Sequence, residues 1–222
     1  MTLSILTAAS LNGVITPARG ASGESLVPVL GVPREVLEWK WEVRRQHDAV
    51  FVGTGTVLVD DPGLTSHALP GRPAVRVTID PAGRIPRSAR FFDGSARTLV
   101  GVSGTTSRDY LDFLAERGVE AVAAGESRID LRRFVAALAE RGLATVAVEG
   151  GGTLNRGLLA EGLVDRLYLI LIPAVLDAGS VNLFEGAGGL AQYRLEECER
   201  IGDYVMLTYG PPIRTTRSPG AS

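Results

Sequence analysis

The 222-residue sequence contains one cysteine, two histidines and one lysine. A single cysteine, Cys198, excludes an intramolecular disulfide framework and a cysteine-rich metal site. The two histidines, His47 and His67, are too few for a histidine-rich zinc site, so we expect no metal centre. Arginine and lysine together number 23 and acidic residues 25, which gives a formal net charge of −2. This balance offers no overall attraction for nucleic acid or for an anionic membrane.

Long hydrophobic runs are also missing. No apolar run reaches the roughly 18 residues that a membrane-spanning helix needs. Residues 1–7 lack the basic flank and long apolar core of a signal peptide. With 45% hydrophobic and 22% charged residues, the composition is typical of a globular domain. We therefore expect a cytoplasmic α/β protein that acts on a small molecule, without nucleic-acid or membrane partners.

Short runs rich in valine and isoleucine alternate with amphipathic segments along the chain. Apolar spacings of three and four predict helices over residues 33–46, 107–118 and 130–142. Nearly continuous apolar runs are typical of strands covered on both faces. Such runs predict strands over residues 3–9, 49–53, 74–79, 98–102, 119–123, 145–148 and 166–172.

This alternation predicts a single three-layer α/β domain with a mostly parallel sheet. Residues 193–200 and 204–209 flank a short turn and predict an antiparallel C-terminal hairpin. We expect the domain to cover residues 1–210, with a flexible tail over residues 211–222, where prolines are frequent and apolar clusters absent. Residues 17–31 are predicted to be a long loop, and long ordered loops tend to be functional.

The strongest local signal is a strand that runs into Gly150, Gly151 and Gly152, followed by a predicted helix that begins near Thr153. Amide groups at a helix start carry partial positive charge, and glycine lets a phosphate approach the backbone, which suits a dinucleotide pyrophosphate. The spacing is not G-x-G-x-x-G, because Asn155 stands at the third glycine position. The alternative is a tight turn in which the glycines serve geometry alone, and the residues by themselves do not decide between the two.

A second glycine-containing segment, predicted as a loop, covers residues 53–62 at the end of another strand. Two glycine turns at strand ends facing one crevice suit the two halves of an extended cofactor. Thr56 can hydrogen-bond a phosphate or an amide, and Asp60 can orient a nicotinamide or a ribose. The alternative for Asp60 and Asp61 is that both cap the turn before Pro62.

Arg44 lies near the end of a predicted helix, where its guanidinium can either clamp a substrate phosphate or simply favour the helix C-terminus. No nucleophile–base pair and no G-x-S-x-G motif is found in the sequence. An enzyme without either can still transfer hydride, because the cofactor carries that chemistry.

Taken together, these segments resemble the RibD C-terminal reductase family of riboflavin biosynthesis, whose fold is similar to that of dihydrofolate reductase. The resemblance covers roughly residues 3–184. The run G-x-x-T-V-L-x-D-D-P-x-L-T followed by V-E-G-G is its most specific part. The matching stretches are residues 9–13, 23–25, 44–48, 52–65, 148–154 and 162–165.

The resemblance implies an NADPH-dependent reductase that transfers hydride to C1′ of a ribosylaminopyrimidine phosphate and forms the ribitylamino product. It also implies a homodimer. Glu149 is implied to accept hydrogen bonds from the pyrimidine and, with Asp60, to act in catalysis. The implied substrate contacts are Ser25, Arg44, Leu64 and Glu149, with His67 at a position where an arginine is expected. The implied cofactor contacts are Ala8, Thr56, Asp60, Gly151, Gly152, Thr153, Leu154 and Asn155, within a stretch that extends to Gly157.

The sequence departs from the family pattern on the substrate side. Family members usually read S-L-D-G-K where this chain has Asn12 and Val14, and many have tryptophan at Val27. With His67 in place of arginine, these changes leave two alternatives open. One is a specialised NADPH-dependent imine or carbonyl reductase of secondary metabolism, or a reductase of a folate-like ring on the same fold, and the other is a non-catalytic small-molecule binder. The basic residues considered for the NADPH preference are Arg84, Arg87 and Arg108.

Overall fold

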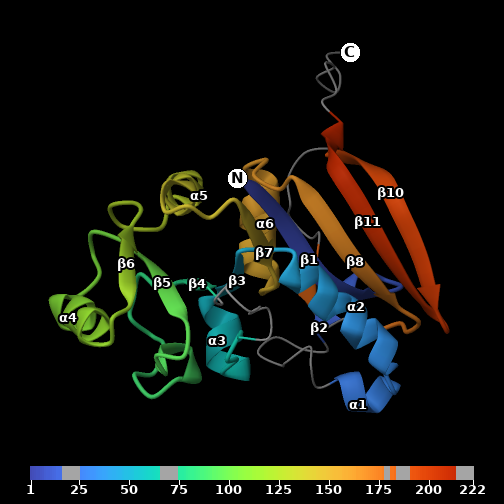
Figure 1. Ribbon diagram of the computed structural model, residues 1–222, viewed down its shortest axis with the longest axis horizontal. Helices are drawn as coiled ribbons and strands as arrows, with labels where there is room; N and C mark the ends of the chain where they lie inside the picture. The colour runs from blue at the N-terminus through green and yellow to red at the C-terminus, as the bar shows by residue number, and fades with distance from the viewer. Residues whose placement is uncertain (17–25, 66–74, 178–180, 184–190, 214–222) are drawn as a thin grey trace.

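The computed structural model describes residues 1–16, 26–65, 75–177, 181–183 and 191–213 (Figure 1). Its parallel strands confirm the runs predicted from the sequence, with ends that differ by at most one residue. They are β1 (Thr2–Ser10), β3 (Ala49–Gly53), β4 (Val75–Ile79), β5 (Arg97–Val102), β6 (Glu120–Ala123), β7 (Thr145–Val148) and β8 (Arg166–Ile172).

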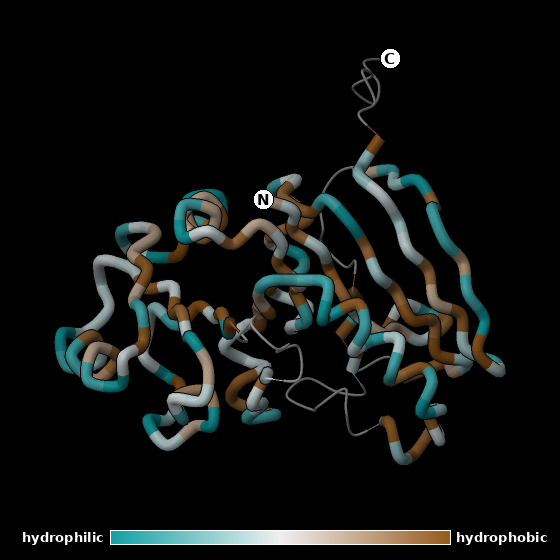
Figure 2. The backbone as a smooth tube through the Cα atoms, viewed as in Figure 1, coloured by the Kyte–Doolittle hydropathy of each residue, from teal (hydrophilic) through white to brown (hydrophobic). Residues whose placement is uncertain are grey.

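The main sheet combines these parallel strands with an antiparallel hairpin at one edge. Within the described residues its order is β10-β11-β8-β1-β7-β3-β4-β5-β6. β11 (Tyr204–Ile213) pairs antiparallel with β8 and with the edge strand β10 (Gln192–Ile201). The mostly parallel sheet and the C-terminal hairpin are therefore both confirmed. In Figure 2 hydrophobic residues follow the central strands, whereas the outer strand β10 is largely hydrophilic.

Four helices begin and end close to where the periodicity places them. They are α2 (Arg34–Arg45), α4 (Arg108–Glu116), α5 (Leu131–Glu140) and α6 (Gly152–Ala160). The Asp130 carboxylate accepts a hydrogen bond of 2.9 Å from the Arg133 backbone amide and caps α5. No helix in the described part of the chain has the length and apolar character to cross a membrane.

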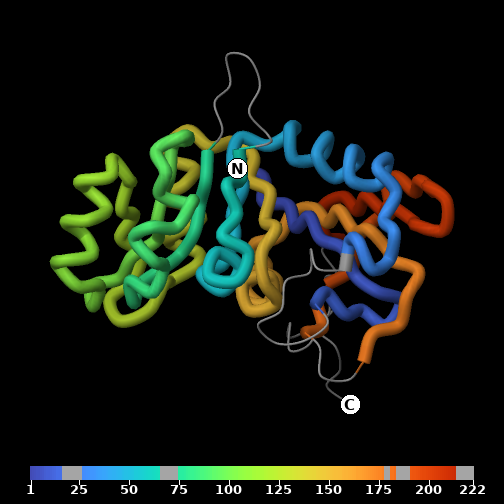
Figure 3. The backbone as a smooth tube through the Cα atoms, turned by 90° about the horizontal axis from the view of Figure 1, so that it is seen from below, coloured from blue at the N-terminus to red at the C-terminus, as the bar shows by residue number. Residues whose placement is uncertain are grey.

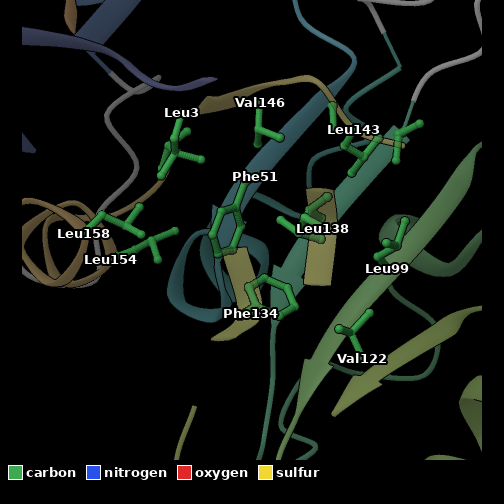
Figure 4. Close-up of a cluster of buried hydrophobic side chains, with 14 of the residues drawn as sticks. Leu3, Phe51, Leu99, Val122, Phe134, Leu138, Leu143, Val146, Leu154 and Leu158 are labelled. Carbon is green, nitrogen blue, oxygen red and sulfur yellow. The ribbon is translucent and has the colours of Figure 1, made fainter. Parts of the chain in front are cut away.

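The helices cover both faces of the sheet, which confirms the three layers. On one face Phe51 of β3 packs with Phe134 and Leu138 of α5 and Leu158 of α6 (Figure 4). On the other face Val36 of α2 packs against strands β8 and β11. Figure 3 shows α2 and α6 on opposite sides of the sheet. Successive strand residues point to opposite faces, so each central strand contributes to both layers.

Residues 54–60 form helix α3 (Thr54–Asp60), so the prediction of a loop over 53–62 is wrong for this part. β-Branched residues such as Val57 are poor helix formers, and two glycines at 53 and 55 resemble a turn. Packing decides otherwise, because Val57 is buried against Val50 and Val52 of the preceding strand.

The C-terminal strand also extends beyond the predicted boundary. Pro212 lies opposite Tyr193, and Ile213 lies opposite Gln192 of β10. β11 therefore ends four residues beyond the predicted strand, which ended at residue 209. Two prolines suggested the end of the strand because proline cannot donate to a ladder, but they are tolerated near sheet edges. The remainder of the expected tail lies outside the described residues.

Three short elements escaped the sequence patterns. Helix α1 (Leu26–Leu30) occupies the end of the segment predicted to be a loop. β2 (Val14–Thr16) and β9 (Val181–Asn182) form a separate two-stranded sheet. Elements of two to five residues carry too little periodicity to be recognised.

Candidate functional site

The predicted site residues converge at the carboxyl ends of three neighbouring strands. β7 lies between β1 and β3 in the sheet. Glu149 follows β7 directly, and its backbone amide donates a hydrogen bond of 2.9 Å to the Phe51 carbonyl of β3. Ala8 lies near the end of β1. This edge of a parallel sheet is where ligands bind in open α/β folds.

Close backbone approach explains the glycines that follow β7. A Cβ atom on Gly150 would lie 2.6 Å from the backbone nitrogen of Gly53, so only glycine lets the ends of β3 and β7 meet in this way. Gly151 has φ of +51°, which disfavours any residue with a side chain. A Cβ atom on Gly152 would collide with Val181 of β9. All three glycines thus have a geometric reason, and the alternative raised by the sequence accounts for them without a ligand.

Polar atoms beside these glycines do point to a ligand. The N-cap residue of α6, Gly151, supplies no side-chain hydrogen bond to the first turn. Asn155 is 1% exposed, and its Oδ1 atom has no partner among the described residues; the same holds for Oδ1 of Asp60. Buried polar atoms are costly unless they are hydrogen-bonded. An extended polar ligand such as a dinucleotide fits these groups.

Helix α3 brings two further candidates to the same place. The Thr56 hydroxyl oxygen lies 3.5 Å from the position of a Cβ atom on Gly151. Thr56 and Asp60 are four residues apart, so they share one helix face. Asp61 instead has φ of +39° and accepts a hydrogen bond of 2.8 Å from the Arg90 backbone amide. The Asp61 side chain therefore binds a distant backbone segment and does not face the site through this oxygen, while Asp60 keeps a carboxylate oxygen without a described partner.

A buried arginine holds the turn that follows α3. The Arg76 side chain is fully buried and donates hydrogen bonds to the Gly63 carbonyl at 3.2 Å and to the Asp93 carboxylate at 2.8 Å. The next residue, Leu64, has φ of +49° and is 8% exposed. A non-glycine residue keeps this backbone conformation only where its surroundings hold it. Arg76 thus contributes to the position of Leu64, a predicted substrate contact.

An ion-pair network occupies the end of β7. Arg44 of α2 donates to both carboxylate oxygens of Glu149, from Nε to Oε1 and from Nη2 to Oε2, each at 2.5 Å. Lys40, one helical turn earlier on α2, places Nζ 3.3 Å from Oε2. The sequence reasoning found Arg44 and Glu149 but missed Lys40. Its spacing of four from Arg44 and its status as the only lysine were the available signals.

Burial and charge act in opposite directions on Glu149. Desolvation by burial favours the neutral carboxyl group, whereas the charges of Lys40 and Arg44 favour the ionised one. The two cations prevail, so the pKa of Glu149 lies below its ordinary value of 4.5. At neutral pH this side chain accepts hydrogen bonds and has no proton to donate.

The other predicted residues lie apart or outside the described ranges. Ser25 and His67 belong to segments that the structure does not describe. Arg87 and Arg108 form exposed ion pairs with acidic residues of α4. The backbone amide of Arg84 donates to Asp80 at 3.0 Å.

The structure explains why this chain has Asn12 at a position where family members usually have aspartate. Its Nδ2 donates to the Leu176 carbonyl at 2.7 Å, while its Oδ1 accepts from the Leu176 amide at 3.1 Å. An ionised aspartate has no donor for the first of these bonds. The amide therefore ties the β1–β2 turn to the segment after β8. Val14 is buried and pairs with Asn182 in the small sheet.

Comparison with known proteins agrees with this arrangement. The model of the RibD C-terminal domain matches residues 2–207. The chain belongs to this family. Membership of this reductase family of riboflavin biosynthesis implies a nicotinamide cofactor, and the orphaned polar atoms beside α6 fit such a group.

Two relatives illustrate the range of the RibD C-terminal family. The 2,5-diamino-6-ribosylamino-4(3H)-pyrimidinone 5′-phosphate reductase of Methanothermobacter thermautotrophicus is 35% identical over 92% of this chain and 96% of its own length. The riboflavin biosynthesis protein RibD of Chlamydia muridarum is 33% identical over 94% of this chain, which spans only 55% of that protein.

Solved structures show the same fold. A pyrimidine reductase-like protein from Corynebacterium diphtheriae superposes with a TM-score of 0.79 at 22% identity, covering 96% of this chain and 92% of its own. The deaminase/reductase from Thermotoga maritima gives 0.73 at 23% identity, covering 95% and 56%. These neighbours have the dihydrofolate reductase-like fold that the resemblance implied.

The lowered pKa of Glu149 predicts how acid affects stability. Above its ordinary pKa of 4.5 the ionised carboxylate contributes fully to folding, and this contribution is lost as the pH falls below that value. Glu149→Gln should lower the unfolding free energy by about 3 kcal/mol near neutral pH, because the buried Arg44 and the partly exposed Lys40 lose their charged partner. The difference in unfolding free energy between Glu149→Gln and the parent protein should then shrink by at most about 1.4 kcal/mol per pH unit on acidification.

Urea unfolding of both proteins across this pH range measures the difference. Asp93 and Glu120 also have lowered pKa values, but both residues are present in both proteins. Their contributions to the pH dependence therefore cancel in the difference. Glu120→Gln, at a partly exposed ion pair, is the matched control and should cost well under half as much. A difference that stays constant down to about pH 3 would show that the Glu149 carboxyl is not held ionised.

Proposed function

We propose that this protein is an NADPH-dependent reductase that converts a ribosylaminopyrimidine 5′-phosphate into its ribitylamino form in riboflavin biosynthesis. Relatives that this chain matches over 80–96% of their lengths are named as 2,5-diamino-6-ribosylamino-4(3H)-pyrimidinone 5′-phosphate reductases, which supports a substrate of this class. The observation that carries the proposal is the buried Glu149 carboxylate beside the uncapped start of α6. This arrangement supports a role for the carboxylate as a hydrogen-bond acceptor for a pyrimidine and a role for the helix start in binding the cofactor's phosphates.

The proposed cofactor contacts come from β1, from helix α3 and from the start of α6. Support comes from the unpartnered Asp60 and Asn155 oxygens and from the approach of Thr56 to Gly151. When bound, the reduced nicotinamide supplies a hydride to C1′ of the sugar. The choice of NADPH rather than NADH follows the family resemblance. The proposed contacts are Ala8, Thr56, Asp60, Gly151, Gly152, Thr153, Leu154 and Asn155.

On the substrate side, Glu149 is proposed to accept hydrogen bonds from the amino groups of the pyrimidine. Together with Arg44 and Lys40 it forms a network with one excess positive charge, which suits a phosphorylated substrate. Asp60 is proposed to orient the nicotinamide or its ribose. The proposed substrate contacts are Ser25, Arg44, Leu64, His67 and Glu149.

The test of this function is turnover of the substrate by the purified protein. With NADPH and the ribosylaminopyrimidine phosphate, the absorbance of the reduced cofactor should fall. Glu149→Gln should lower kcat/KM by about 10- to 100-fold, since a hydrogen bond to a charged group is worth about 1.5–3 kcal/mol. Its NADPH affinity, measured by calorimetry, should change little.

Three other outcomes would contradict parts of this assignment. An unchanged rate in Glu149→Gln would refute the role of this carboxylate. NADPH binding without turnover would favour a different imine or carbonyl substrate. Absence of NADPH binding would leave no support for a reductase.

The glycine at 151 provides a separate test of the cofactor site. Gly151→Ala and Gly162→Ala both place a side chain at positive φ, +51° and +64°, and each should lose about 1 kcal/mol of stability. Only Gly151 adjoins Thr56, so only its substitution should weaken NADPH binding, by about tenfold. Calorimetric titration of both variants compares them, and equal affinities would place the cofactor elsewhere.

We also propose that two copies of the chain pair through the sheet near its hairpin edge. Leu169 and Leu171 of β8 lie opposite Leu207 and Val205 of β11, which makes one apolar, half-exposed surface. None of these four side chains belongs to a buried cluster of the described residues. An apolar face of this kind is typical of contacts between subunits.

Light scattering should therefore give twice the mass of one chain. Leu207→Glu should shift the mass to that of a single chain, because it places a charge within the apolar face. Val29→Glu, at a 76% exposed position on α1, is the control and should leave the mass unchanged. A single-chain mass for the parent protein would contradict the pairing.

A further inference from the structure

The proposed reaction needs a proton as well as a hydride. When C1′ of the ring-opened imine accepts a hydride, a C–H bond forms and the π electrons of the C=N bond move to nitrogen. That nitrogen must then take up one proton to become the amine of the ribitylamino product. An acid positioned at the site typically contributes about 100- to 10,000-fold to such a step.

The ion-pair network at the end of β7 contains three charged groups, and two of them cannot supply this proton. Glu149 is held ionised by two cations, so it has none to give. The guanidinium of Arg44 does not release its protons in proteins. The ammonium of Lys40 is the only one of the three that can both give up a proton and regain it.

The position of Lys40 suits a group that works with solvent. Its side chain is 27% exposed, compared with 9% for Arg44 and 5% for Glu149. Of its three N–H donors, one points to Oε2 of Glu149 at 3.3 Å. An ammonium group of this kind keeps further donors for a ligand. Arg44, which grips both carboxylate oxygens, holds Glu149 in place beside it.

We propose that Lys40 is the acid that protonates the substrate nitrogen. This inference rests on the proposed function. Nζ of Lys40 donates a proton to the imine nitrogen as hydride reaches C1′, the nicotinamide is oxidised, and the neutral amine of Lys40 regains its proton from water. Glu149 accepts a hydrogen bond from Nζ and directs the group toward the bound pyrimidine.

Two substitutions separate proton donation from charge. Lys40→Met removes both the positive charge beside Glu149 and the transferable proton. Lys40→Arg keeps a positive charge beside Glu149, but its guanidinium cannot release a proton. Both should lower kcat by about 100-fold or more. The KM for the substrate and the Kd for NADPH should stay within a few-fold of the parent values. Arg34→Met, which removes an exposed cation from the same helix, is the matched control and should keep full activity.

Each contrary result would overturn a different part of the proposal. Near-parent kcat in Lys40→Arg would overturn the proposal and leave Lys40 a purely electrostatic role. Near-parent kcat in Lys40→Met would overturn any role in the reaction. A parent protein that binds NADPH but does not turn over the substrate would overturn the proposed function and the proton donor together. An active parent with unaffected variants would overturn the proton donor alone.

Chemical modification of the folded parent protein avoids any folding defect in the variants. Lys40 is the only lysine of the sequence, so an amine-selective acetylating reagent modifies this side chain and any free terminal amine. The same treatment of Lys40→Met shows whether modification outside Lys40 changes NADPH binding, and the same treatment of Arg34→Met, which keeps Lys40, should abolish turnover as in the parent protein. Acetylation should abolish turnover of the parent protein without weakening NADPH binding measured by fluorescence. Full activity after complete acetylation of Lys40, measured by mass spectrometry, would overturn the proposal.

Discussion

The fork of hydrogen bonds between Arg44 and Glu149 joins helix α2 to the end of β7. A buried carboxylate is costly to ionise, and this one is ionised because Arg44 and Lys40 offset the lost hydration. The same pairing fixes the direction of the carboxylate oxygens beside the start of α6. The charge state, the orientation and the proposed chemistry of the site therefore all depend on two side chains of one helix face.

Close approach of backbone segments is the second constraint. Gly53 and Gly150 let β3 and β7 end in contact, so that α3 and α6 begin side by side. This brings Thr56 to Gly151 and leaves polar oxygens of Asp60 and Asn155 without described partners. The glycines are thus explained by packing, and the orphaned oxygens are the observation that points to a ligand.

Much of the fold could be predicted because strands covered on both faces have a distinct composition. The strands at residues 49–53, 145–148 and 166–172 were predicted with the observed ends. Helix α3 was not, since its threonines and valines favour other structures locally and the helix is stabilised by burial of Thr54 and Val57. Within the site, the motif residues were recognisable, but Lys40 belongs to no motif and was missed.

The sequence by itself determined the fold class, the family and the segments that meet at the site, because these depend on local pattern and on motif spacing. Only the tertiary structure decided that Asp61 binds the backbone amide of Arg90 while an oxygen of Asp60 has no described partner, and that Asn12 binds the peptide of Leu176. It also decided that Lys40 and Arg44 share one carboxylate more than 100 residues away in the chain. Such partnerships depend on distance in space, and no local pattern encodes them.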